Sequence, residues 1–440
     1  MNARIETGAA HAHLRDAIRQ STTVRRIGRV AEAYGTLIRV TGIQASIGEV
    51  CELISPHSRL LAEVVGVTRQ HTLLTPLGSL EGLSPNTEVT VVGRRATTPA
   101  GDAQLGRILD ALGRPMDDKG DLVCTDEVPI YRDSPNPLTR RLIERPLGSG
   151  VRAIDAALTL GEGQRVGIFA LAGGGKSTLL GMLARGGDAE VNVIVLVGER
   201  GREVNEFIHD NLGAEGLARS VLIVATSDRP ALERSRAAYT GTAIAEYFRD
   251  RGKRVLLLMD SVTRFARALR DVGLAIGEPP ARLGYPPSIF SALPKLFERS
   301  GNNEHGSITA LYTVLMEDDD GSDPIAEEVR SILDGHIVLS KKLAAAYHYP
   351  AIDILSSASR VMPRVATPEH QRAAGMLRKY LAKYQEIELL VQLGEYKRGS
   401  DADADFALDR IGVINALLRQ DAHRLTSFGD ALAGLDKVLA

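Results

Sequence analysis

The chain has few cysteines, no long apolar run and almost no excess of charge. Cys51 and Cys124 are the only two cysteines among 440 residues, and they do not have the spacing of metal ligands. We therefore expect free, reduced thiols and a cytosolic protein. No apolar run approaches the roughly 20 residues that span a bilayer, and residues 1–12 lack the apolar core of a signal peptide. Neither an integral membrane protein nor signal-directed export is expected.

The charge balance argues against nucleic acid as a partner. The formal net charge is −2 at pH 7, which gives no global attraction to nucleic acid or to an anionic membrane. Residues 11–19 are expected to form either a surface helix or a solvated arm, and membrane association would depend on such a helix or on partners. With 44% hydrophobic residues and no repeat, the composition is that of a globular protein with two or three domains.

Short β-branched runs separated by glycine dominate residues 22–95 and predict a small β-barrel that packs protomers together. The runs are Arg26–Val30, Thr36–Val40, Gly48–Leu53, Leu61–Val65 and Glu88–Val92. Residues 97–137 are rich in glycine and proline, which predicts a linker across a surface.

Residues 165–178 read as a strand, a phosphate-binding loop and the start of a helix. Because residues 173–175 are all glycine, consecutive backbone N–H groups can surround phosphate oxygens, and the helix adds its positive end. Lys176 supplies a charge for the β- and γ-phosphates, and the Ser177 hydroxyl is expected on Mg²⁺. Ala170 stands where the GxxxxGK[ST] pattern has its first glycine, which affects the conformation of the loop and not its role.

Compact apolar runs alternate with helical patterns after Gly150, which predicts buried parallel strands covered by helices. Ligands are then expected at the carboxyl ends of the strands. The predicted strands are Arg165–Leu171, Val191–Val197, Ser220–Ala225, Arg254–Met259, Ser307–Leu315 and His336–Ser340. After Glu369 the strands stop, and helical patterns over Arg372–Leu393 and Phe406–Ala440 predict a C-terminal helical domain.

Two carboxylates follow predicted strands. Asp260 ends an apolar run and is expected to hold Mg²⁺; a cap on the helix from Ser261 is the structural alternative. Glu199 follows another buried run and is the candidate general base. Arg200 and Arg202 are either catalytic cations or ion-pair partners of nearby glutamates, and the residue pattern leaves both interpretations open.

Several motifs together resemble the ATPases of type III protein secretion systems, which are relatives of the catalytic subunits of rotary ATP synthases. The motifs are Lys176-Ser177, Gly198–Val204, Leu258–Arg267, Gly284–Ser288 and Tyr349–Asp353. The match covers nearly the whole chain. It implies an α/β fold with a RecA-like P-loop core and a predominantly parallel sheet over residues 96–370. An arm over 1–21 and the β-barrel over 22–95 precede this core, and the helical domain over 371–440 follows it.

The resemblance also implies the roles of individual residues. Residues expected at the nucleotide are Ala172, Gly173, Gly174, Gly175, Lys176, Ser177, Thr178 and Tyr349, although Tyr349 could equally pack in the core instead of stacking on adenine. Ser177 and Asp260 would hold Mg²⁺. The catalytic set would be Lys176, Glu199, Arg200, Arg264 and Arg360, with Arg360 reaching into the site of the neighbouring protomer.

The implied function is a Mg²⁺-dependent ATPase that acts as a homohexameric ring and energises chaperone release, unfolding and export of secreted proteins. The implied partners are further copies of the chain, stator and central-stalk proteins and chaperone–substrate complexes, at the cytoplasmic face of the bacterial inner membrane. The segment Asp323–Ser331 favours the injectisome branch over the flagellar export ATPase. One alternative is a non-catalytic ring subunit, and the presence of Glu199 argues against it. The other is an RNA-translocating hexamer, and the mild net negative charge of the chain argues against that.

Overall fold

The computed structural model describes residues 26–56, 58–171, 173–316 and 323–439. The chain divides into two compact units, residues 1–95 and residues 96–440. The expected arm over residues 1–21, His57, Ala172 and the acidic run after Met316 lie outside the described residues. None of the described helices combines the length and the apolar character needed to traverse a lipid bilayer.

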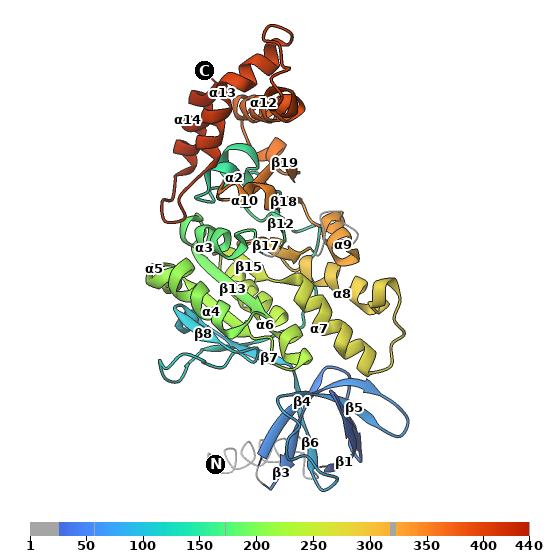
Figure 1. The fold of residues 1–440 in the computed structure, drawn as a ribbon. Coiled ribbons are helices and arrows are strands. Elements are labelled where there is room, and N and C mark those ends of the chain that lie inside the picture. The colour runs from blue at the N-terminus through green and yellow to red at the C-terminus, as the bar shows by residue number, and fades with distance from the viewer. Residues whose placement is uncertain (1–25, 57, 172, 317–322, 440) are drawn as a thin grey trace, which may run out of the picture. The chain divides into compact units, whose positions relative to one another are not determined.

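The first unit contains a closed six-stranded antiparallel barrel, as Figure 1 shows in blue. Its strands are β1 (Gly28–Tyr34), β2 (Leu37–Thr41), β3 (Glu49–Ser55), β4 (Ser58–Val67), β5 (Thr72–Leu77) and β6 (Glu88–Arg95), in the spatial order β1-β2-β5-β4-β3-β6. Alternate side chains such as Ile38, Val40 and Leu53 fill the interior. The sequence predicts five of the six strands. It misses β5 because Pro76 and flanking threonines hide its alternation.

A nine-stranded, mostly parallel sheet forms the centre of the second unit, and the predicted fold class is confirmed. The spatial order is β19-β18-β12-β17-β15-β13-β14-β8; β16 pairs antiparallel with β17, and β19 is antiparallel to β18. The strands are β8 (Arg107–Leu109), β12 (Arg165–Ala170), β13 (Val191–Val197), β14 (Ser220–Ala225), β15 (Arg254–Asp260), β16 (Gly301–Asn302), β17 (Ser307–Leu315), β18 (Gly335–Leu339) and β19 (Ile352–Ser359).

Helices cover both faces of this sheet (Figure 1). Successive residues of each strand point to opposite sides, and because both sides carry apolar residues, both faces must be buried. In β12, Ile168 packs into the first core and Phe169 into the second. The first core is closed by α2 (Arg152–Ala157), α3 (Lys176–Gly186), α12 (Pro368–Gln392), α13 (Ala402–Leu418) and α14 (Phe428–Leu439). The second is closed by α6 (Ala231–Asp250), α7 (Val262–Ala275), α8 (Pro287–Phe297) and α9 (Pro324–Ile332).

Shorter elements complete the unit. These are β7 (Thr97–Ala100), β9 (Asp126–Pro129), β10 (Pro146–Leu147), β11 (Leu160–Gly161), α4 (Gly201–Glu206), a π-helical turn (Phe207–Leu212), α5 (Gly213–Ala218), α10 (Lys341–Ala345), α11 (Met362–Val365) and 3₁₀ turns at Asp102–Gln104 and Arg282–Gly284.

Two expectations need correction. The supposed linker over residues 97–137 contains three strands, and β8 joins the edge of the main sheet beside β14. A strand of three residues is too short to show a periodicity in sequence. The C-terminal helical pattern is also interrupted, because α13 ends at Leu418 and α14 begins at Phe428.

A buried ion pair ties α6 to the segment after α8, and we expect its loss to be costly. Arg299 donates to both Glu246 carboxylate oxygens at 3.0 and 2.7 Å, and its third nitrogen donates to the Ile130 carbonyl at 2.6 Å. Both side chains are at most 2% exposed. Arg299→Met leaves the buried Glu246 carboxylate with only the more distant Arg132, at 3.9 Å, and should lower the free energy of unfolding by about 3–5 kcal/mol in urea denaturation.

The exposed pair Arg254–Glu190 provides the control, since Arg254→Met should cost less than about 1 kcal/mol. Equal losses for the two variants would contradict the prediction.

Candidate active site

The phosphate-binding loop lies between the carboxyl end of β12 and the start of α3. Gly173 and Gly175 have φ angles of +82° and +79°, the left-handed region that glycine adopts without strain. The Gly174 N–H donates to the Leu171 carbonyl at 3.2 Å, and α3 begins at Lys176. A Cβ added to Gly173 would meet no atom within 4 Å, so the loop is open on that side.

Lys176 joins two carboxylates from neighbouring strands. Its Nζ lies 2.6 Å from Asp260 Oδ1 and 3.3 Å from Glu199 Oε1. The three side chains are only 4–13% exposed. Burial by itself lowers the pKa of Lys176, but the two carboxylates outweigh it and hold the pKa above its ordinary value. Lys176 is therefore a fixed cation at the mouth of the loop.

Asp260 ends β15 and is held from a second strand. The Thr313 hydroxyl of β17 donates to Asp260 Oδ1 at 2.7 Å. The alternative in which Asp260 caps the next helix is wrong, because Ser261 is the N-cap of α7 and accepts from the Arg264 N–H at 3.3 Å. The Asp260 carboxylate thus points at the loop.

Glu199 follows β13 after one residue, Gly198, and pairs with a cation from α7. Arg264 Nη1 lies 2.8 Å from Glu199 Oε2 and also donates to the Gly198 carbonyl. Gly198 permits this approach, because an added Cβ would lie 3.0 Å from Arg264 Cδ. Burial and the neighbouring Asp260 carboxylate raise the pKa of Glu199 to about 7, despite the opposing charges of Lys176 and Arg264. A carboxyl group with such a pKa is poised to exchange a proton near neutral pH.

Arg200 and Arg202 lie apart from this cluster. Arg200 pairs with Glu203 at 3.4 Å and Arg202 with Glu206 at 3.5 Å, and both arginines are more than three-quarters exposed. Such exposed pairs contribute little to stability. Both side chains can therefore reorient toward a ligand.

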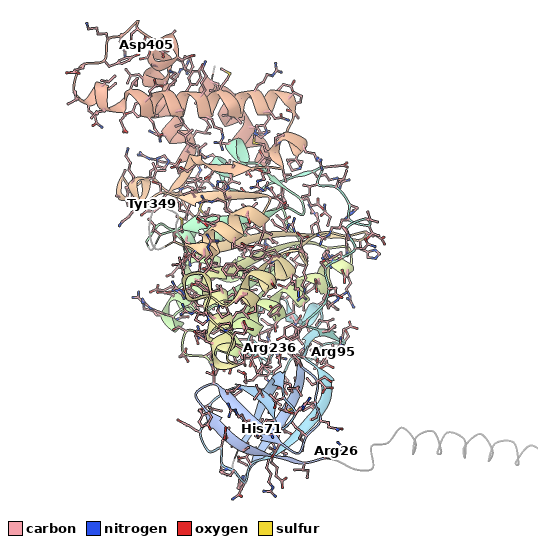
Figure 2. The ribbon with its side chains drawn as sticks, turned by 90° about the vertical axis from the view of Figure 1, so that its right-hand side faces the viewer. Arg26, His71, Arg95, Arg236, Tyr349 and Asp405 are labelled. Atoms are coloured by element: carbon pink, nitrogen blue, oxygen red, sulfur yellow. The ribbon has the colours of Figure 1, made fainter. Side chains whose placement is uncertain are left out.

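Tyr349 lies against the phosphate loop. A Cβ added to Gly175 would come within 3.2 Å of the Tyr349 ring, so the ring walls one side of the loop. The side chain is half-buried, and its ring also meets the exposed Tyr347 edge-to-face at 5.7 Å (Figure 2 labels Tyr349). One aromatic wall beside a phosphate loop suits a flat base.

Arg360 is not brought to the loop of its own protomer. It follows β19, and its N–H donates to the Asp334 carbonyl at the amino end of β18. The loop follows Ala170, which pairs with Leu339 at the carboxyl end of β18. Five strand residues, about 16 Å, therefore separate the two places along the sheet.

The site fits a Mg²⁺–nucleotide complex by the chemistry of its donors. Oxygen ligands for Mg²⁺ would come from Asp260 and from the exposed Ser177 hydroxyl at the first turn of α3. Mg²⁺ is commonly held by one or two protein oxygens together with substrate phosphates. Lys176 is a cation for the same phosphates, and Thr178 lies beside Ser177 on the first turn of α3.

Two positioning residues escape sequence reasoning. Thr313 is one of several polar residues in β17, together with Ser307, Thr309 and Tyr312, so no local signal distinguishes it. Gln420 carries no local signal: its N–H donates to the Tyr349 carbonyl at 2.9 Å and its Nε2 to the Gly150 carbonyl at 2.7 Å. It therefore connects the loop of Tyr349 to the segment that precedes α2.

Asp155 gives a pH-dependent prediction. Burial raises the pKa of Asp155 to about 7, although hydrogen bonds from Ser149 N and Oγ to its Oδ1 act to lower the pKa. Its Oδ2 has no hydrogen-bond partner in the described part of the chain. The native state then holds a proton that the unfolded chain releases near pH 4. Stability should fall as pH rises from about 4 to 7, by up to about 1.4 kcal/mol per pH unit.

Asp155→Asn should remove this slope and gain about 1–3 kcal/mol relative to the parent at pH 8, measured by urea denaturation between pH 5 and 8. Asp118→Asn, at an exposed position, controls for the loss of one charge. A difference between parent and Asp155→Asn that does not change with pH would refute this.

Three family descriptions match successive parts of the chain. Residues 30–93 match the β-barrel domain of the ATP synthase alpha/beta family, and residues 150–359 match its nucleotide-binding domain. Residues 366–437 match the C-terminal domain of the type III secretion ATPase EscN. The three matches follow the order of barrel, sheet and helices in the structure.

Individual proteins match over nearly their whole length. The chain is 59% identical to the type 3 secretion system ATPase of Xanthomonas euvesicatoria, over 94% of each chain. It is 46% identical to the flagellum-specific ATP synthase of Bacillus subtilis, over 96% of this chain and 97% of the relative. Assembled EscN of enteropathogenic E. coli superposes with a TM-score of 0.89 at 50% identity, and EscN in complex with its central stalk EscO with 0.88 at 49%; each covers 94% of this chain and 100% of the other.

Proposed function

Since the chain belongs to the type 3 secretion system ATPases, we propose that it works as a homohexameric, Mg²⁺-dependent ring that drives unfolding, chaperone release and export of secreted proteins. The observation that carries the catalytic part is the buried cluster of Lys176, Glu199, Asp260 and Arg264 at the mouth of the phosphate loop. The related EscN, described as an assembled ATPase, supports the ring.

Residues of one protomer bind and orient the nucleotide. The loop N–H groups and Lys176 contact the phosphates, and Tyr349 stacks on the base. Ser177 and Asp260 would hold Mg²⁺, which would neutralise charge on the phosphates. Phosphate binding draws Lys176 from its carboxylate partners, because the nucleotide supplies a stronger anion at the same place.

Glu199 accepts the proton of the attacking water. Arg264 holds its carboxylate at 2.8 Å, which fixes the direction of the base. Arg200 turns from its exposed pair toward the γ-phosphate. Arg360 lies too far from the loop of its own protomer and acts on the nucleotide of the next one, so each site is complete only at a boundary between protomers.

Assembly tests this proposal. The rate of ATP hydrolysis per protomer should increase severalfold with protein concentration, in parallel with a rise in mass from protomer to hexamer. Mass measurement by light scattering, with and without a non-hydrolysable ATP analogue, checks both together. Constant activity per protomer across the assembly range would overturn the interprotomer site, and stimulation by RNA with a steep salt dependence would instead favour an RNA translocase.

We favour the injectisome over the flagellar branch. The identity to the Xanthomonas secretion ATPase, 59%, exceeds that to the Bacillus flagellar protein, 46%. Partners would then be the central stalk, as in the complex of EscN with EscO, together with stator proteins and chaperone–substrate complexes. The ring would sit at the cytoplasmic face of the inner membrane, held there by the apparatus. Restored motility in a strain lacking its flagellar ATPase, without restored injectisome secretion, would reverse this assignment.

A further inference from the structure

Two exposed arginines from different elements lie side by side at the amino edge of the sheet. Arg330 is in the last turn of α9, and Arg360 follows β19. Arg360 Nη2 donates to the main-chain carbonyl of Arg330 at 3.4 Å. Both side chains are exposed, and neither forms an ion pair with a carboxylate of the described residues.

Further basic residues lie around the same place. His336 of β18 is half-buried there, and its Nε2 lies 3.1 Å from the Ser356 carbonyl. Burial, and then the charges of Arg330, Arg360 and Arg378, lower the pKa of His336. Arg378 of α12 donates to the Ser357 carbonyl. We call Arg330, Arg360 and Arg378 the cationic edge; a surface that places like charges together favours an anionic ligand.

Arg330 is held in place by a contact that leaves its donors free. Its guanidinium carbon lies 4.8 Å from the centre of the Phe169 ring, a cation–π arrangement. A cation–π contact needs no hydrogen bond to a carbonyl or carboxylate, so the N–H groups of Arg330 stay available for a ligand. Phe169 is fully buried in β12, which gives Arg330 a rigid support.

We propose that Arg330 is a second arginine that, together with Arg360, reaches the terminal phosphates of the ATP bound by the neighbouring protomer. The inference rests on the proposed function, in which Arg360 acts across the protomer boundary. Two forked guanidinium groups match the several oxygens of a phosphate chain better than one. The nucleotide of the second copy supplies the anionic partner that Arg330 and Arg360 lack among the described residues.

Substitution of the guanidinium tests the proposal, because the carbonyl that holds Arg360 is kept in every variant. Arg330→Ala should lower kcat about 100-fold, the loss typical of one transition-state donor, with an unchanged hexamer mass and KM within about threefold. Arg330→Lys should recover only part of this loss, since an ammonium cannot bind two oxygens in a fork. Arg372→Ala, which removes an exposed arginine that contacts Glu369 and the Pro368 carbonyl, is the control and should retain the parent kcat.

The double variant separates a shared role from two unrelated effects. If both arginines act on one phosphate, Arg330→Ala with Arg360→Ala should lose no more than about threefold beyond Arg360→Ala alone, since groups acting as a unit are not additive. Multiplied losses would contradict a shared role.

Mixed rings show on which protomer Arg330 acts. Lys176→Ala protein is inactive itself but carries both arginines. Added in excess, it should raise turnover per Arg330→Ala protomer at least fivefold above that of Arg330→Ala alone. Wild-type protein mixed with the same excess of Lys176→Ala protein shows how far inactive protomers inhibit a ring. No rise, where wild type tolerates the excess, would place the effect of Arg330 within its own protomer and overturn the proposal. A normal kcat of Arg360→Ala would instead contradict the interprotomer site itself. A lowered kcat of Arg360→Ala together with a parent-like kcat of Arg330→Ala would contradict only the inference about Arg330.

Discussion

Replacement of Glu199 by glutamine is expected to lower ATP turnover about 10³-fold while leaving nucleotide binding and ring assembly intact. Glutamine keeps the size of the side chain and can still accept from Arg264, but it cannot take the proton of the attacking water. Steady-state hydrolysis, together with binding of a fluorescent ATP analogue, checks both parts. Glu206→Gln is the matched control, because Glu206 is on the same segment, half-exposed, and pairs only with Arg202.

The pH profile provides an independent readout of the same residue. A base must be ionised to act, and burial beside Asp260 raises the pKa of Glu199 to about 7. The parent kcat/KM should therefore rise with pH below about 7 and level off above it, since kcat/KM reports ionisations of the free enzyme. Near-parental turnover of folded Glu199→Gln would remove Glu199 from the role of base.

Replacement of Arg360 by alanine is expected to reduce turnover about 10³-fold in the assembled ring, the effect of losing an arginine that stabilises the transferring phosphoryl group from outside the site. The mass of the ring should not change, because Arg360 is an exposed side chain whose hydrogen bond goes to a main-chain carbonyl. The activity per protomer should also rise little with protein concentration, since assembly then no longer brings Arg360 to the neighbouring site. Arg360→Lys should remain impaired for the geometric reason that applies at Arg330.

Parent-like activity of Arg360→Ala in rings of full mass would contradict the interprotomer site. A loss of activity accompanied by a loss of the ring would point to assembly, which light scattering on the same samples separates. Arg372→Ala again controls for the removal of one exposed positive charge.

Local sequence was sufficient wherever a site residue depends on a strand and the turn after it. Few other structures produce an apolar run followed by a small or charged residue. This pattern therefore identifies the glycines of the loop, Lys176 and the ends of β13 and β15. Parallel strands also present their carboxyl ends at one edge, so Glu199 and Asp260 could be placed near Lys176 without knowing the strand order. The distances of 3.3 and 2.6 Å confirm that placement.

The rest required strands and helices that are far apart in the chain. The Asp260 carboxylate is held toward the loop by Thr313 of β17, and the contact of Tyr349 with Gly175 depends on how the segment before β19 returns to the loop. The three-residue β8 became a strand only because the edge of β14 was available to pair with it.

The sequence by itself therefore determined the chemistry of this protein: the phosphate loop, the two carboxylates and the family, because these depend on short motifs whose geometry is local. Only the tertiary structure decided which groups hold those carboxylates and where the remaining arginines lie. Antiparallel pairing of β19 with β18 puts Arg360 at the amino edge of the sheet, beside Arg330 and away from Lys176. Strand order and direction are set by packing among distant segments, and no local pattern records them.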